Sequence, residues 1–259
     1  WTITTTKQFG EIDWFAGYTK MRANDIFELT SAQSESSYAR SVRADGENIS
    51  AARSNFMVEH KLITGLDYTT QFFGNNDTRF SLVYVAKSGE PYSVTFDGYE
   101  DAFSNDRTDG GYDAAYIPTG ASDPNVVFAS SSVADAVMAH VNGSGLASYK
   151  GQIVPRNAFN SPWIRTLDLR ITQDINIAND HKVIVYLDVT NLLNLIDDED
   201  GIIREYSNRS RQIILDEDNP YDSQGRYNIV GVDPDDGLFV QGRAGQSSYQ
   251  WNLGFKYQF

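Results

Sequence analysis

The sequence predicts an all-β fold: a segment of about seven strands of a transmembrane antiparallel β-barrel. The final stretch, 249–259, alternates strictly between apolar and polar or glycine residues, which is the period of a strand with two unlike faces. Similar segments recur along the chain, and the connections between them are short and long in turn. No apolar run approaches the roughly 20 residues that cross a bilayer as a helix.

The final strand carries the clearest pattern. Its odd positions are Tyr249, Trp251, Leu253, Phe255, Tyr257 and Phe259. A strand with so apolar a face would aggregate at an edge exposed to water. In a barrel wall, by contrast, one face meets lipid and the other meets a water-filled lumen.

Six other segments alternate in the same way. The expected strands span about 1–9, 12–21, 61–73, 79–87, 164–175, 182–190 and 247–259. Most are close to the 9–11 residues of a tilted transmembrane strand. Because a bacterial single-chain barrel has an even number of strands, this segment is not expected to close by itself.

The connections predict the orientation of the barrel. Short turns follow residues 9, 73 and 175, whereas long polar segments cover about 22–58, 88–162 and 193–246. In outer-membrane barrels the short turns face the periplasm and the long loops face outside. The three long segments are therefore expected to be extracellular loops, and the C-terminus is expected to be periplasmic.

Alternation also predicts which side chains share a face, since a slip of one residue would reverse every one of them. The residues expected to face lipid are Leu62, Leu66, Phe72, Leu82, Tyr84, Leu167, Leu169, Val183, Val185 and Leu187. The residues expected to face the lumen are Asp67, Asp168, Arg170 and Asp188. We expect the lumen side chains to bond within the wall or to a plug; direct contact with a substrate is the alternative.

Composition excludes several classes of protein. The 259 residues are 41% hydrophobic, which excludes a disordered polymer, and the net charge of −14 argues against nucleic acid as a partner. The absence of cysteine excludes disulfides and thiolate metal sites. The three histidines lie in different expected turns or loops, so no catalytic triad can be read and no enzyme is expected.

Two features of the long segments have alternative interpretations. Acidic runs in 193–246 offer oxygen ligands for Ca²⁺, although a solvated acidic surface is the simpler interpretation; no other cofactor is expected. The candidate ligands are Asp197, Asp198, Asp200, Asp233 and Asp235. The aromatic residues of 88–162 are expected to pack the loop, with a substrate vestibule as the alternative. They include Tyr92, Phe96, Tyr99, Tyr112 and Tyr116.

Several motifs follow one another after residue 60. They are Ser88-Gly-Glu-Pro-Tyr92, Tyr112–Asp123, Tyr149–Ala158, Ser161–Gln173 and Leu187–Asn194, and then Asn252, Gly254, Tyr257 and Phe259 in the final strand. In this order they resemble the C-terminal part of TonB-dependent outer-membrane receptors, most closely the Oar-like branch. Asn252, Gly254, Tyr257 and Phe259 resemble the signal by which the barrel-assembly machinery recognises outer-membrane barrels.

The resemblance implies a barrel of about 22 strands, of which this chain would be the last third. It also implies a plug domain and, often, an N-terminal β-sandwich, and neither lies in this sequence. Because no signal peptide precedes Trp1, the chain is expected to be part of a longer polypeptide. The implied partners are the rest of the barrel and its plug, outer-membrane lipid and lipopolysaccharide, the inner-membrane TonB complex and the assembly machinery.

Three functions stay open at this point. The first is uptake of an unidentified nutrient by a TonB-dependent receptor in the outer membrane. The others are a structural or adhesion protein of the outer membrane and one subunit of a larger channel complex. For the fold, a soluble β-sandwich is the alternative, but such long loops are unusual in a compact domain.

Overall fold

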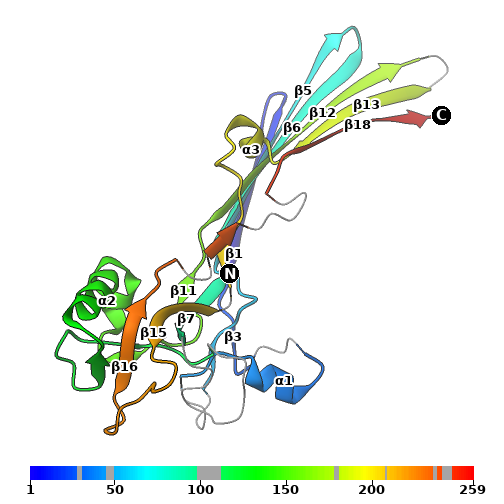
Figure 1. Cartoon of the computed structure of the whole chain (residues 1–259). Helices are drawn as coiled ribbons and strands as arrows, with labels where there is room; N and C mark the ends of the chain where they lie inside the picture. Colours follow the sequence, from blue (N-terminus) through cyan, green and yellow to red (C-terminus); the bar gives the residue numbers. More distant parts are fainter. Residues whose placement is uncertain are drawn as a thin grey trace.

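A computed structural model describes residues 1–27, 31–44, 50–97, 112–177, 181–207, 209–235, 238–240 and 247–259. The chain is predominantly β, with antiparallel pairing throughout its largest sheet. That sheet occupies one end of an elongated molecule, and a smaller unit built around a second sheet occupies the other end (Figure 1).

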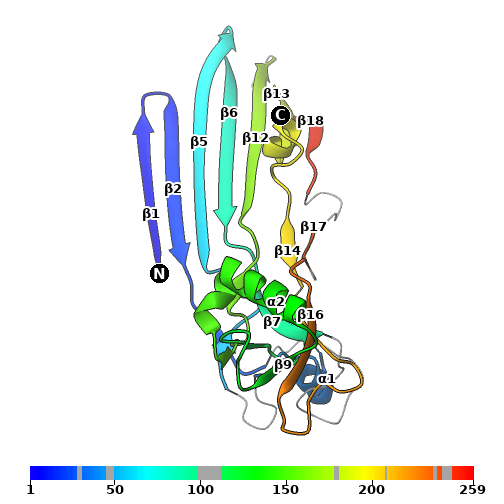
Figure 2. The ribbon, with the colours of Figure 1, turned by 60° about the vertical axis from the view of Figure 1, so that its left-hand side comes forward.

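The largest sheet has seven strands, and their order in space is their order in the chain (Figure 2). They are β1 (Thr2–Phe9), β2 (Ile12–Lys20), β5 (His60–Phe73), β6 (Asn76–Lys87), β12 (Ile164–Asn176), β13 (Lys182–Thr190) and β18 (Gln250–Gln258). Each overlaps a strand expected from the sequence; β6, for example, begins at Asn76 rather than at residue 79. The positions of these seven strands are therefore confirmed.

Tight turns join two of the hairpins in this seven-stranded sheet. Gly10 and Gly74 have φ angles of 61° and 66°, in the left-handed region that glycine enters without steric cost. The sheet has two edges, since β1 and β18 each pair with a single neighbour among the described residues. Both edges present backbone N–H and C=O groups that a further strand would satisfy.

The three long segments connect the strands of this sheet, and their position outside the cell stays a prediction. Their described parts fold into a second body, which we call the loop unit. A mixed sheet runs through it in the order β11 (Phe159–Asn160), β7 (Pro91–Asp97), β15 (Arg209–Leu215), β16 (Tyr227–Val232) and β9 (Val126–Phe128). Strand β7 pairs with β15 in parallel although they are far apart in the chain. The segments 88–162 and 193–246 therefore contribute strands to the same sheet.

Shorter elements surround this mixed sheet. Three pairs of short strands are β3 (Asn24–Asp25) with β4 (Ala52–Arg53), β8 (Tyr116–Ile117) with β10 (Gln152–Ile153), and β14 (Arg204–Tyr206) with β17 (Leu238–Val240). The helices are α1 (Ser34–Ala39), α2 (Ser131–Gly143), η1 (Gly145–Tyr149) and α3 (Leu192–Ile196). No helix in the described ranges has the length and apolarity needed to cross a membrane.

Helix α2, with 13 residues, is the longest helix among the described residues. The Ser130 hydroxyl caps it by accepting a hydrogen bond from the N–H of Val133 at 3.2 Å. Val137 and Val141 are four residues apart and share the face that packs into the loop unit, where both are fully buried. This apolar spacing is typical of a helix and was present in the sequence.

The loop unit has its own hydrophobic core, which explains why it is compact. The core residues include Val94, Phe96, Ile117, Val126, Val137, Val141, Leu146, Val154, Ile213, Leu215 and Ile229. Phe96 and Tyr116 are buried in it, so the packing interpretation of these aromatic residues is confirmed. Tyr92 stacks on Tyr206 at 4.2 Å between ring centroids, and Tyr99 lies outside the described residues.

Candidate functional site

One face of the seven-stranded sheet is apolar. The strand registers place one residue of each strand in transverse rows. From β2 to β18 a central row consists of Trp14, Leu66, Leu82, Leu169, Val189 and Trp251, and Lys7 of the edge strand β1 lies at its end. All ten residues that alternation assigned to lipid alternate in step with this row and therefore lie on the same face of the sheet. We call it the apolar face; that it meets lipid stays a prediction.

Within the described residues, little covers the apolar face. Phe72, Leu253 and Phe255 expose 63%, 69% and 77% of their surface, and Ile3 exposes 64%. Scattered exposed apolar residues are normal, but a contiguous apolar surface across a whole sheet is rare on a soluble monomer. The apolar face therefore requires a partner of matching chemistry.

Aromatic rings cross the apolar face at the end nearest the loop unit. Trp1, Tyr18, His60 and Trp163 come from β1 to β12 and contact one another in sequence, with ring centroids 5.4, 6.0 and 6.1 Å apart. The Tyr18 hydroxyl also lies 2.6 Å from Nδ1 of His60. We call this row the loop-side belt. It combines apolar ring faces with polar edge groups.

A second group of rings lies at the opposite end, near the short turns. Phe80 stacks on Tyr68 at 6.4 Å and meets Phe72 edge-on at 6.3 Å. Tyr257 stacks on His181 at 5.7 Å, and its hydroxyl lies 2.7 Å from Nδ1 of that histidine. We call these rings the turn-side belt. The two belts lie on either side of the central row of the apolar face.

The separation of the belts can be estimated along β5. From His60 to Phe72 the strand extends about 40 Å at roughly 3.3 Å per residue. If the strand were tilted by about 40°, as the strands of transmembrane barrels are, this length would span about 30 Å along the barrel axis. That height is comparable to the hydrocarbon thickness of a bilayer, about 30 Å.

The reverse face of the seven-stranded sheet carries a polar row. Successive strand registers align Gln8, Asp13, Asp67, Ser81, Arg170, Asp188 and Asn252. The row crosses all seven strands without an apolar residue. We call this reverse side the polar face. Three of the four residues predicted to face the lumen, Asp67, Arg170 and Asp188, lie in this one row.

Two pairs of neighbours in the polar row are bonded to each other. The Ser81 hydroxyl donates a hydrogen bond to the carboxylate of Asp67. Arg170 Nε lies 3.1 Å from Asp188 Oδ1, and the Arg170 guanidinium lies over the ring of Tyr186, 5.0 Å from its centroid. The neighbouring pair Lys182 and Asp174 adds a further ion pair between β12 and β13. Such cross-strand pairs stabilise the sheet and give the polar face a fixed pattern of charge.

Asp168 shares the polar face but lies outside this row. Its Oδ1 accepts a hydrogen bond from the backbone N–H of Asn191 at 2.8 Å. Asn191 follows the last residue of β13 and has φ 54° and ψ 53°, in the left-handed region. Asp168 therefore supports the end of the neighbouring strand. That it lines a lumen is untested.

The four residues of the expected assembly signal divide between the two faces. Asn252 and Gly254 lie on the polar face, and Tyr257 and Phe259 belong to the turn-side belt. Phe259 is 94% exposed. The presence of glycine at position 254 has a local explanation, because a Cβ there would lie 2.4 Å from Cζ of Tyr186. The Tyr186 ring lies between Gly254 and Arg170, an arrangement that the sequence analysis did not predict.

The candidate calcium ligands are not brought together. Among the described residues, no three His, Cys, Asp or Glu side chains form a group able to hold a metal ion. Asp197 Oδ1 accepts the N–H of Glu199 at 3.0 Å, and Asp233 Oδ1 accepts the N–H of Asp235 at 3.1 Å. Asp198 and Asp200 contribute backbone oxygens to Asn194. These aspartates serve local turns, so the calcium prediction gains no support.

The motifs that were separate in the sequence meet where the seven-stranded sheet joins the loop unit. A Cβ on Gly89 would lie 2.5 Å from the carbonyl oxygens of Ser161 and Pro162. Asn157, fully buried with φ 58°, accepts a hydrogen bond from the Ser93 hydroxyl at 3.2 Å. Next to it, Arg156 Nη2 binds Asp25 Oδ1 at 2.5 Å. The Gly89 contact lies next to the ends of β6 and β12, whereas the other two contacts join residues of the loop unit that are far apart in the chain.

Comparison of the chain with protein-family models, with curated proteins and with solved structures found no match in any of the three.

Proposed function

We propose that this chain forms part of the wall and the extracellular loops of a TonB-dependent receptor in the outer membrane of a Gram-negative bacterium. In this proposal the apolar face meets lipid and the polar face meets the interior of the barrel. The complete receptor takes up a nutrient that is not identified, and further strands of the same barrel pair with β1 and β18.

The observation that carries the proposal is the contrast between the two faces of one sheet. An uncovered apolar face, bordered by two aromatic belts that would lie about 30 Å apart at the strand tilt of a barrel, fits a bilayer with an interface on each side. The polar row on the reverse face fits a water-filled or plugged interior. A soluble sandwich would instead bury the apolar face against a second sheet, and the described residues contain no sheet that covers it.

The position of the loop unit supports the proposed orientation of the chain in the membrane. All three long connections leave the seven-stranded sheet at its end toward the loop unit (Figure 1). Short turns on one side and large loops on the other are typical of outer-membrane barrels, whose loops face outside. The motifs at the junction with the loop unit are also those that resemble Oar-like receptors.

The membrane part of the proposal is tested with two neighbouring substitutions. Because the chain has no cysteine, Ser81→Cys on the polar face and Leu82→Cys on the apolar face each introduce a single thiol. In outer membranes that contain the full-length receptor, we expect a water-soluble maleimide to label Ser81→Cys. We expect Leu82→Cys to react only with a lipid-soluble maleimide. Equal labelling of both by the water-soluble reagent would contradict a lipid-facing wall.

The transport part is tested separately from the membrane part. Deletion of the receptor should reduce growth on the limiting nutrient, and this effect should disappear in cells that lack the TonB complex. A structural or adhesion function would survive loss of that complex, because neither needs energy from the inner membrane. The comparison is made by competition between paired strains.

A further inference from the structure

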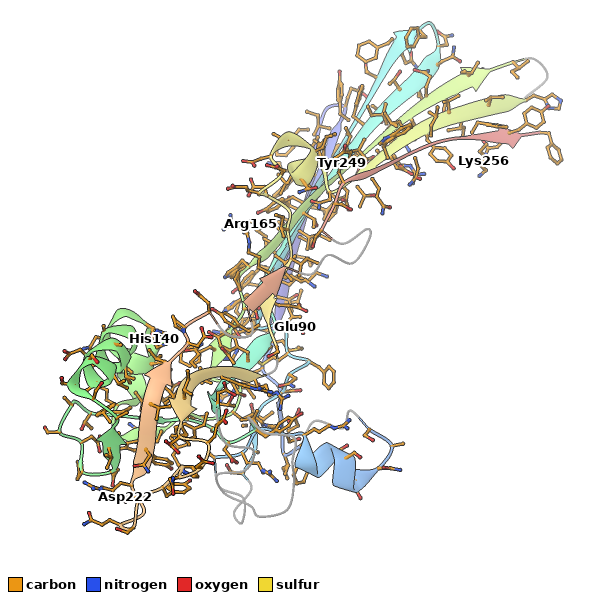
Figure 3. The ribbon with its side chains drawn as sticks, in the orientation of Figure 1. Glu90, His140, Arg165, Asp222, Tyr249 and Lys256 are labelled. Atoms are coloured by element: carbon orange, nitrogen blue, oxygen red, sulfur yellow. The ribbon has the colours of Figure 1, made fainter. Side chains whose placement is uncertain are left out.

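A cavity of about 480 Å³ opens in the loop unit, and its lining comes entirely from described residues. It lies between the segment that precedes β9, the turn at Gly151 and the turn that connects β15 with β16. Asp222, in the last of these turns, lies at the end of the loop unit farthest from the seven-stranded sheet (Figure 3). The site is a shallow, open depression rather than an enclosed cavity, so a ligand would bind there by one face.

Three tyrosine rings form one wall of this cavity. Tyr227 stacks on Tyr116 with centroids 5.5 Å apart and an interplanar angle of 15°. Tyr221 leans against Tyr227 at 5.2 Å and 44°. Behind them, Phe96 contacts Tyr227 at 5.0 Å and connects the rings to the hydrophobic core. The wall is therefore an aromatic surface supported from within.

Hydrogen bonds hold this wall in place. The Tyr116 hydroxyl donates to Asp123 at 3.1 Å, and the same carboxylate accepts the N–H of Thr119 at 2.7 Å. The backbone N–H of Tyr227 donates to the carbonyl of Asn125 at 2.9 Å. A preformed surface loses little conformational entropy when a ligand binds.

The polar groups that line the cavity are uncharged. The Asn125 side chain donates to the Tyr116 hydroxyl at 3.0 Å, which leaves its amide oxygen as an acceptor. The Gln152 side chain is exposed, and its amide offers both donors and an acceptor. The lining contains no Lys, Arg, Asp or Glu. The nearby Asp222 is already paired with Arg226 at 2.6 Å.

We propose that this cavity binds a neutral saccharide. The C–H groups on one face of a sugar ring fit the electron-rich face of an aromatic ring, and sugar hydroxyls fit side-chain amides that donate and accept. The absence of basic residues in the lining disfavours an anionic ligand, and the absence of carboxylates disfavours a cation. The site does not depend on the proposed receptor function, since binding at the loop unit requires neither a membrane nor transport.

The test uses the full-length protein that contains this chain, purified in detergent micelles. The probes are immobilised neutral oligosaccharides of glucose, galactose, mannose and N-acetylglucosamine, followed by calorimetry with any free oligosaccharide that binds. We expect Tyr221→Ala to weaken binding by about tenfold, as the loss of an aromatic contact implies. Tyr221→Phe should bind nearly as well as the unaltered chain, because it keeps the ring.

A second variant tests the site without a change to its aromatic residues, so that loss of binding can be distinguished from misfolding. Gln152→Ala removes an exposed side chain outside the core, and we expect it to weaken binding several-fold. Tyr249→Ala removes a tyrosine from the seven-stranded sheet and should leave binding unchanged. The proposal is overturned if no neutral oligosaccharide binds, or if Tyr221→Ala and Gln152→Ala both bind as tightly as the unaltered chain. Binding that persists while the cysteine labelling fails would overturn only the receptor function.

Discussion

Asp168 Oδ1 accepts the backbone N–H of Asn191 at 2.8 Å, and this bond connects β12 to the residue at which β13 ends. Asn191 is 2% exposed, and its side chain donates to the carbonyl of Gly201 at 2.9 Å. A Cβ on Gly201 would lie 2.1 Å from Asn191 Oδ1. Two of the motifs that resemble the receptor family, Ser161–Gln173 and Leu187–Asn194, are therefore joined by this contact.

Two substitutions of Asn191 should separate the contribution of its side-chain bond to stability from that of its backbone conformation. Asn191→Gly keeps a residue suited to the left-handed conformation and loses only the side-chain bond. Asn191→Ala adds backbone strain, and we expect it to cost about 1–3 kcal/mol in the free energy of unfolding. Urea unfolding in detergent micelles measures both. A cost of Asn191→Ala no larger than that of Asn191→Gly would exclude strain at this position.

Gly254→Ala should disturb the polar face. The new methyl would lie 2.4 Å from Cζ of Tyr186, so that ring must move and its contact with Arg170 is weakened. We expect a loss of about 1–3 kcal/mol, which is typical of overpacking. Addition of Tyr186→Ala to Gly254→Ala removes the clash, so the double variant should lose less than the two single variants together.

A matched control is available for this glycine. A Cβ on Gly120, in the loop unit, would meet no atom within 4 Å. Gly120→Ala should therefore leave stability nearly unchanged in the same assay. If Gly120→Ala and Gly254→Ala have equal effects, contact with Tyr186 does not explain the glycine in the final strand.

The C-terminal aromatic residues should matter more for assembly than for stability. Phe259→Ser with Tyr257→Ser is expected to reduce the folded yield of the full-length receptor far more than Phe72→Ser does. Phe72 and Phe259 are both exposed, at 63% and 94%, and burial of one aromatic ring in lipid gives only about 1.5–3 kcal/mol. Folded yield is read from mobility in gels without boiling. Equal yields would remove the assembly signal and leave an aromatic strand end.

Tyr227 should titrate at high pH. Burial, which is the largest cause, and the negative charge of Asp113 together raise its pKa to about 12. Since the pKa of an unfolded tyrosine is about 10, the folded state favours the protonated phenol. This contribution to stability is fully present below about pH 10 and is lost as the pH rises through about 12.

The measurement for Tyr227 is a difference titration of tyrosinate absorbance. Subtraction of Tyr227→Phe from the unaltered chain should leave one component with a midpoint near pH 12. Tyr92, whose pKa burial also raises to about 12, offers a parallel variant, Tyr92→Phe. A component near pH 10 for Tyr227 would show that its hydroxyl is open to water.

The long segments show what sequence reasoning could have found and did not. Val133, Val137 and Val141 recur at helical spacing after a capping Ser130, so α2 was predictable from the pattern. The core that α2 joins was not, because Phe96 and Ile213 lie in different segments and only the parallel pairing of β7 with β15 brings them together. Most of the core residues lie in 88–162, and Ile213, Leu215 and Ile229 of the segment 193–246 complete the core.

The sequence by itself determined the seven long strands and the residues that share each face, because side chains alternate with a period of two whatever the strands pair with. Only the tertiary structure determined which residues of different strands lie side by side in one transverse row. The register between strands sets which residues face one another, and it brought Asp67, Arg170 and Asp188 into one polar row and Trp1, Tyr18, His60 and Trp163 into one belt. Periodicity within a strand is local, whereas register and the core of the loop unit depend on contacts between residues far apart in the chain.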